Sequence, residues 1–122
     1  LKRISENFVN NEVDEYKLRK LDKEEAKKQL MQLYGVGPAS VGILLFELLH
    51  HYDAFDKVFP WEQKIYSRLL FGEELVPPQM ILDEVDRRWG KWKMLAAHYI
   101  FEDLFWKRET QHIEWLEKLI KR

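Results

Sequence analysis

The spacing of apolar residues along the chain predicts helices. In "LDKEEAKKQLMQL", Ala26, Leu30 and Leu33 recur at intervals of four and three, which places them on one face of a helix. Asp22 begins this run with Glu25 three residues later, the pattern of a capping box at a helix start. No segment alternates apolar and polar positions for long enough to indicate a strand. The sequence therefore predicts an all-α fold of about five to seven helices.

Prolines and glycines mark the ends of the later helices. Pro38, Pro60 and Pro78 each begin an apolar run, and proline suits a first helical position because the N–H that it lacks would be unpaired there. Gly72 and Gly90 follow the second and third of these runs, as expected of residues that end helices. The run beginning at Pro38 and ending near residue 49 is apolar nearly all round, which predicts a central buried helix.

Further apolar positions complete the expected core. A long, largely buried helix is predicted from about residue 91 to about residue 107, and an amphipathic helix follows it. The inward residues expected in the later helices are Ile65, Leu69, Leu70, Ile81, Leu82, Val85, Trp89, Ala96, Ala97, Ile113, Leu116 and Ile120. Residues 5–18 are polar and fit a short helix or a loop, with anchors at Phe8, Val9, Val13, Tyr16 and Leu18. The sequence of residues 50–59 indicates a loop.

Composition narrows the functional classes. The 122 residues suit a single domain spanning 1–122. The 20 basic and 21 acidic residues nearly cancel, which argues against long-range attraction to nucleic acid but leaves a local basic patch open. The absence of cysteine excludes disulfides, thiol chemistry and cysteine metal sites. The longest apolar run, "VGILLFELL", is too short to span a bilayer and no secretory signal is visible, so we expect a cytoplasmic protein without a membrane partner.

The turn Gly35-Val36-Gly37-Pro38 joins two of the predicted helices. Glycine supplies the positive φ angles of so short a connection, and a plain helical hairpin needs nothing more. A second interpretation uses the exposed backbone, because glycine amides and an adjoining helix N-terminus can bind a phosphate oxygen without lysine or arginine. Such contacts position DNA without reading its sequence. The tetrapeptide alone leaves both interpretations open.

Three segments carry a resemblance to a known family. "LYGVGPASVGILLF" resembles the hairpin of the helix-hairpin-helix DNA glycosylase superfamily, although Tyr34 stands where the family usually has proline. "VFPWEQKIYSRLLF" is similar to the family segment that holds the catalytic acid, and "WGKWKMLAAHYIFEDLFW" to a later family helix. The resemblance covers about residues 22–107, with the helix-hairpin-helix at 22–50 and the other two motifs within 60–107.

The resemblance implies removal of a damaged base that has been flipped out of double-stranded DNA. A family carboxylate offsets the positive charge that develops on the sugar, and its position corresponds to Glu62, where the family has aspartate. The alternative is that Glu62 is a helix-start glutamate, favoured by the helix dipole alone. The position of the family's nucleophilic lysine holds Ala39, so the resemblance implies a monofunctional, hydrolytic enzyme, closer to the alkylated-base glycosylases than to the strand-cleaving ones.

Binding residues follow from the same resemblance. The expected DNA-backbone contacts are Gly35, Gly37, Ala39, Ser40 and Lys64. For Lys64 an ordinary exposed helix lysine is an equal alternative. We expect no cofactor and no metal held by side chains.

Two weaker assignments concern the base and a cation. Trp61 and Trp92 could line a base pocket, because aromatic rings stack on flipped bases, although core packing is the commoner duty of tryptophan. In some family structures hairpin carbonyls hold a monovalent cation, and the matching carbonyls would be those of Met31, Leu33 and Val36. The adjacent His50 and His51 do not suggest zinc, because the sequence offers no matched second pair of ligands.

Most of one family lobe has no counterpart before the hairpin. The sequence begins at Leu1 and fits three alternatives: the C-terminal part of a longer glycosylase, a chain completed by a second chain or by its own homodimer partner, or a reduced relative that binds DNA without cutting. The main alternative function is therefore a non-catalytic helix-hairpin-helix DNA-binding module, and a helical domain whose hairpin binds nothing is a more distant one. A bacterial or archaeal nucleoid is the expected location.

Overall fold

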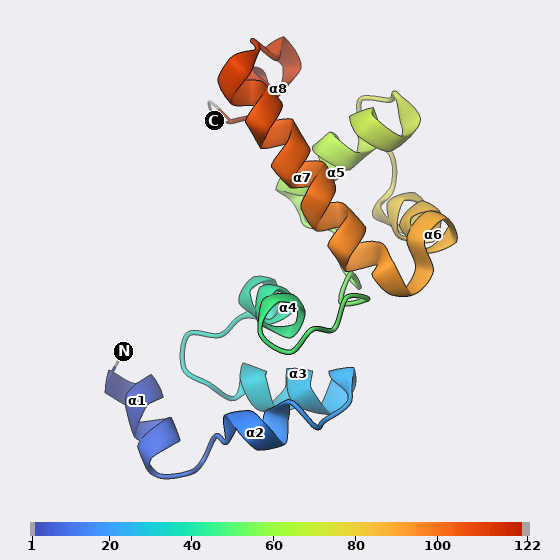
Figure 1. Ribbon diagram of the computed structural model, residues 1–122. Coiled ribbons are helices and arrows are strands. Elements are labelled where there is room, and N and C mark those ends of the chain that lie inside the picture. Colours follow the sequence, from blue (N-terminus) through green and yellow to red (C-terminus); the bar gives the residue numbers. More distant parts are fainter. Residues whose placement is uncertain (1, 121–122) are drawn as a thin grey trace. The chain divides into compact units, whose positions relative to one another are not determined.

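The computed structural model describes residues 2–120, and all regular elements in that range are helical (Figure 1). The all-α prediction is confirmed. The elements are α1 (Lys2–Val9), α2 (Glu15–Leu18), α3 (Lys23–Met31), α4 (Pro38–Glu47), α5 (Pro60–Tyr66), the π-helical η1 (Ser67–Phe71), α6 (Pro78–Trp89), the 3-10 turn η2 (Gly90–Trp92), α7 (Lys93–Thr110) and α8 (Glu114–Ile120). The chain forms two compact units, one ending at Ala54 and one beginning at Phe55. The single domain over 1–122 stays a prediction.

The core of the first unit lies between α3 and α4. Ala26, Leu30 and Leu33 are all buried, as their spacing predicted. Asp22 caps α3, because its side-chain oxygen accepts a hydrogen bond from the Glu25 N–H at 2.9 Å. The remaining buried members of this cluster are Leu18, Val41, Leu45 and Ala54.

Two expectations for the first unit are wrong. The helix α4 is buried along one face, whereas Ile43 and Leu48 are each 51% exposed, because α3 covers only one side of it in this unit. In the N-terminal segment Leu18 is buried and Val13 packs against the cluster, but Phe8, Val9 and Tyr16 are exposed. The helix α1 buries no side chain, so the polar segment before Leu18 contributes little to the core.

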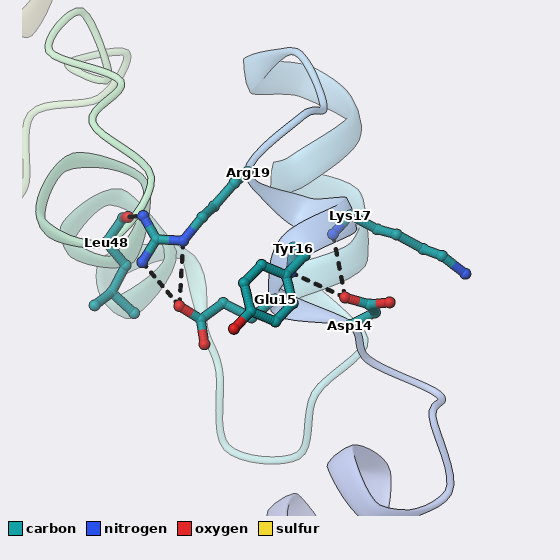
Figure 2. A network of polar contacts seen from close by, with 6 residues as sticks. All are labelled: Asp14, Glu15, Tyr16, Lys17, Arg19 and Leu48. Carbon is teal, nitrogen blue, oxygen red and sulfur yellow. Dashed lines mark hydrogen bonds and ion pairs between the residues drawn. The ribbon is translucent and has the colours of Figure 1, made fainter.

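A polar network holds α2 against the end of α4 (Figure 2). Arg19 donates from Nη1 to the carbonyl oxygen of Leu48 at 3.1 Å, and its Nη2 pairs with Glu15 at 2.8 Å. Asp14 caps α2 by accepting hydrogen bonds from two backbone amides. The arginine thereby satisfies a carbonyl that a helix C-terminus leaves without an intrahelical partner. This contact fixes the second hairpin helix at the end opposite the turn.

The second unit is built on α5, α6, α7 and α8. Ile81 and Val85 of α6 are fully buried, with Leu82 and Trp89 packed beside them, as predicted. Gly72 and Gly90 follow η1 and α6 with φ of 70° and 48°, which agrees with their predicted role at helix ends. The smaller cluster of Ile65, Leu104 and Leu116 joins α5, α7 and α8.

Three expectations for the second unit are wrong. Leu69 is 41% exposed, because the π-helical geometry of η1 changes the rotation per residue and turns this position away from the core. The helix α7 is not largely buried, since Ala97 and Leu104 are its only buried residues and Tyr99 and Trp106 are about two-thirds exposed, at 65% and 66%. Ile120 is also exposed, whereas Leu116 is fully buried and Ile113 partly so.

Candidate functional site

The hairpin between α3 and α4 is a tight turn closed by its own backbone. The Val36 N–H donates to the Leu33 carbonyl oxygen at 3.1 Å, and the Val41 N–H donates to the Gly37 carbonyl oxygen at 2.9 Å. Gly35 has a φ of +85°, in the region that glycine adopts without a steric penalty. The glycine at 35 is therefore explained by the turn itself.

The backbone angles of Gly37 do not themselves require glycine, although helix N-caps favour it over alanine. Gly37 is the N-cap of α4 with a φ of −102° and a ψ of 179°, extended angles that any residue adopts. A Cβ atom placed on Gly37 would meet no described atom within 4 Å. Neither backbone strain nor crowding in the described chain therefore requires a glycine here. What the missing side chain leaves is open space over the backbone at the start of α4.

Backbone donors lie next to Gly37 in the chain. Ala39 and Ser40 lie in the first turn of α4 and are exposed. The first N–H of α4 that donates to a backbone carbonyl is that of Val41, whose acceptor is the Gly37 carbonyl oxygen. First-turn amides have no intrahelical acceptor, and the N-terminus of a helix carries partial positive charge. The turn and the first helical residues together form a concentration of donors suited to an anion.

A cation also lies beside the turn. The guanidinium carbon of Arg3, from α1, lies 4.8 Å from the centroid of the Tyr34 ring, a cation–π distance. Tyr34 is 63% exposed and directly precedes Gly35. Nothing in the sequence pairs Arg3 with Tyr34, because the two residues are 31 positions apart in the chain. The contact brings a positive charge to a turn that has none of its own.

Glu62 is the buried carboxylate of the second unit. It occupies the third position of α5 and is 9% exposed. Its Oε1 accepts a hydrogen bond from the Phe59 N–H at 2.8 Å, so the side chain closes the first turn of its own helix. Burial raises the pKa of the Glu62 carboxyl, and the hydrogen bond from Phe59 opposes this rise.

The surroundings of Glu62 also affect Tyr66. Burial raises the pKa of the Tyr66 hydroxyl, and the negative charge of Glu62 raises it further. The Tyr66 ring is 1% exposed and lies edge-on to Phe55 and Phe101. Glu62 thus stands at the edge of an aromatic cluster, and its helix-capping bond occupies only Oε1. No described residue donates a hydrogen bond to Oε2.

The two tryptophans assigned to a base pocket are exposed. Trp61 is 61% exposed with its ring centroid 5.6 Å from that of Phe101, and Trp92 is 48% exposed with the Lys91 Nζ 5.2 Å from its ring centroid. Trp61 directly precedes Glu62, so an aromatic surface and a carboxylate are neighbours at the start of α5. Lys64, two residues after Glu62, is half-buried in the same helix.

The proposed cation carbonyls lie along the turn. Met31 ends α3, and the Leu33 oxygen already accepts the Val36 N–H while retaining a second lone pair. Among the described residues, no three His, Cys, Asp or Glu side chains come close enough together to hold a metal ion. His50 has a positive φ of 60°, and its Nδ1 atom lies 3.3 Å from the hydroxyl oxygen of Tyr52. Over residues 2–120, no helix combines the length and the apolar character needed to cross a membrane.

Comparison with protein-family models, with curated proteins and with solved structures found no match to this chain.

Proposed function

We propose that this protein binds double-stranded DNA through the hairpin of α3 and α4 and hydrolyses the N-glycosidic bond of a flipped, damaged base, without cutting the strand. The observation that carries the proposal is Gly37, a glycine that neither the turn angles nor the packing of the described chain requires. A phosphate approaching the Gly37, Ala39 and Ser40 backbone would need the open space that a side chain at position 37 would fill. The resemblance of the hairpin to that of DNA glycosylases supports the same assignment.

Glu62 is the proposed carboxylate of the reaction. A group near the sugar must be negatively charged to offset positive charge at the breaking bond, and it acts more strongly where water is excluded. Glu62 is a mostly buried carboxylate with one oxygen held by the Phe59 N–H, which fixes the side chain in one orientation. A burial-raised pKa is a common property of functional carboxylates, although helix-capping glutamates can share it. Ala39 leaves no lysine at the hairpin for a covalent route, so water is the proposed nucleophile.

The test is base release with protein in excess over DNA. Duplexes that carry alkylated, oxidised or deaminated bases are incubated with the native protein, Glu62→Gln and the control Glu102→Gln, which changes an exposed glutamate of α7. We expect lesion-dependent release that Glu62→Gln abolishes and Glu102→Gln preserves. Release that persists unchanged in Glu62→Gln would remove this residue from the mechanism.

A non-catalytic helix-hairpin-helix DNA-binding module is the second candidate. The hydrogen bond between Glu62 and Phe59 favours it, because a helix-start role already accounts for a glutamate at this position. This candidate predicts DNA binding that weakens as salt rises, with no release from any lesion. A chain that shows neither release nor salt-dependent binding would contradict both candidates.

A further inference from the structure

A basic pocket opens in the second unit, which begins at Phe55. It has a volume of about 490 Å³ and is lined by Lys64 and Arg68 from α5 and η1, by Glu74 after them, and by Glu114, Trp115 and Lys118 from α8. Its volume lies in the range of small-ligand pockets, about 300–1,000 Å³. The pocket contains no residue of the hairpin and does not contain Glu62, although Lys64, one of the expected DNA-backbone contacts, lines it.

Two of its cations have no acidic partner. No described carboxylate lies within ion-pair distance of Lys64 or Arg68, whereas Lys118 pairs with Glu114 at 2.6 Å. The guanidinium carbon of Arg68 lies 5.7 Å from the centroid of the Trp115 ring, so the arginine is held on an aromatic surface without being neutralised. An arginine in this state keeps its planar set of donors available for an oxyanion.

We propose that this pocket binds a nucleoside monophosphate unit, with the phosphate between Lys64 and Arg68. Leu119 and the Trp115 ring give the pocket an apolar wall, which suits a base or sugar beside the phosphate. Glu74 and Glu114 line the same pocket and disfavour further negative charge, so a single phosphate fits better than a triphosphate chain. The unit is either a free mononucleotide or one nucleotide of a single strand, since both present the same groups.

The test is calorimetric titration of the native protein with adenosine monophosphate, adenosine, inorganic phosphate, adenosine triphosphate and a short single-stranded oligonucleotide. We expect the monophosphate to bind more tightly than adenosine, inorganic phosphate or the triphosphate. Binding of the monophosphate identifies the free nucleotide as the source, and binding of the oligonucleotide alone identifies the strand. The proposal would be overturned if adenosine or inorganic phosphate bound as tightly as the monophosphate, or if the triphosphate bound more tightly. It would also be overturned if neither adenosine monophosphate nor the oligonucleotide bound.

Three variants separate the pocket from a general loss of structure. Arg68→Gln should weaken monophosphate binding by about 10- to 100-fold, the loss of a charge-assisted contact. Arg87→Gln, the matched control, changes an exposed arginine of α6 that pairs with Glu84 outside the pocket, and should leave binding unchanged. Glu74→Gln should tighten binding by removing a nearby negative charge, a gain that unfolding cannot produce. Weaker binding in Glu74→Gln would contradict the assigned electrostatics.

Discussion

The carboxylate of Glu62 closes the first turn of its own helix by accepting the Phe59 N–H at 2.8 Å. This bond satisfies one of the backbone donors that a helix start leaves unpaired, and it holds a buried acidic group in place. A glutamine keeps an amide oxygen for the same bond but removes the charge. The capping role and the proposed chemical role of Glu62 can therefore be separated by one substitution.

Glu62→Gln should change how stability depends on pH. The folded pKa of Glu62 lies above its unfolded value, so the folded protein binds more protons than the unfolded chain between those two values. The stabilising contribution of protonated Glu62 is complete below the unfolded pKa and is lost as pH rises through the folded pKa. We therefore expect the native free energy of unfolding, relative to that of Glu62→Gln, to fall as pH rises from about 4.5, the ordinary value of a glutamate, through the raised folded pKa. Urea unfolding across this range measures it, and Gln79→Ala of α6 controls for general pH effects. A constant difference between the native chain and Glu62→Gln would contradict the raised pKa.

Gly37→Ala should preserve the fold and weaken DNA binding. The extended angles and the empty surroundings of Gly37 accept a methyl group without strain, so the fold should be preserved, with only the modest loss of stability expected when alanine replaces an N-cap glycine. The methyl group would stand in the proposed path of the phosphate, and loss of charge-assisted amide contacts corresponds to about 10- to 100-fold in affinity. Fluorescence anisotropy with labelled duplex measures the change. Gly42→Ala is the matched control, because this glycine lies inside α4 with equally open surroundings and should gain about 0.5–1 kcal/mol without losing affinity. If Gly37→Ala bound DNA as tightly as the native protein, the hairpin would not be the DNA contact.

Gly35→Ala should act through stability. The φ of +85° at Gly35 would force alanine into the left-handed region, which costs roughly 1–2 kcal/mol. Urea unfolding should therefore show a larger loss of stability for Gly35→Ala than for Gly37→Ala. Equal stability of the two alanine variants would contradict the different backbone angles of the two glycines.

Arg3→Gln should weaken DNA binding and reduce its dependence on salt. The Arg3 guanidinium rests on the exposed Tyr34 ring next to Gly35, close to the proposed phosphate position. One phosphate contact accounts for a slope of about one in the logarithm of affinity against the logarithm of salt concentration. Titrations at several salt concentrations should show this decrease, with Lys17→Gln of α2 as a control for net charge. An unchanged slope would show that Arg3 does not touch the DNA.

The spacing of apolar residues predicted the buried faces correctly where one face of a helix packs against one neighbouring element. The buried faces of α3 and α6, including Ala26 and Ile81, followed from intervals of three and four residues. The same reasoning failed for α4 and α7, because an apolar helix surface shows what could be buried and not how many neighbours cover it. The exposure of Leu69 depends on the π-helical turn η1, which leaves no simple mark in the order of residues.

The candidate site was predictable only where chemistry is local. The turn glycines and the helix-start position of Glu62 follow from neighbouring residues, so the sequence indicated them. The contact between Arg3 and Tyr34 joins residues far apart in the chain, and the electrostatic interaction between Glu62 and the buried Tyr66 appears only once the chain has folded. Such relationships arise from tertiary packing, which a single sequence does not display.

Ser67 is the clearest case of a residue whose role only the packing shows. It is fully buried in η1, where its hydroxyl donates to the Gln63 carbonyl oxygen at 2.7 Å and accepts the Val76 N–H at 3.0 Å. The Gln63 side chain also donates to the Val76 carbonyl oxygen at 2.8 Å, so both backbone groups of Val76 are held by α5 and η1. The serine thus anchors the segment that leads into α6.

Ser67→Ala should destabilise the second unit by about 1–3 kcal/mol, because the substitution leaves the Val76 N–H without an acceptor in a buried position. Urea unfolding followed by tryptophan fluorescence measures the loss. Gln79→Ala removes an exposed side-chain hydrogen bond to Asp83 and should change stability by less than about 0.5 kcal/mol. If Ser67→Ala lost no more stability than Gln79→Ala, water or a shifted backbone would be accepting the hydrogen bond of the Val76 N–H. In that case the π-helical turn could not owe its position to the serine hydroxyl.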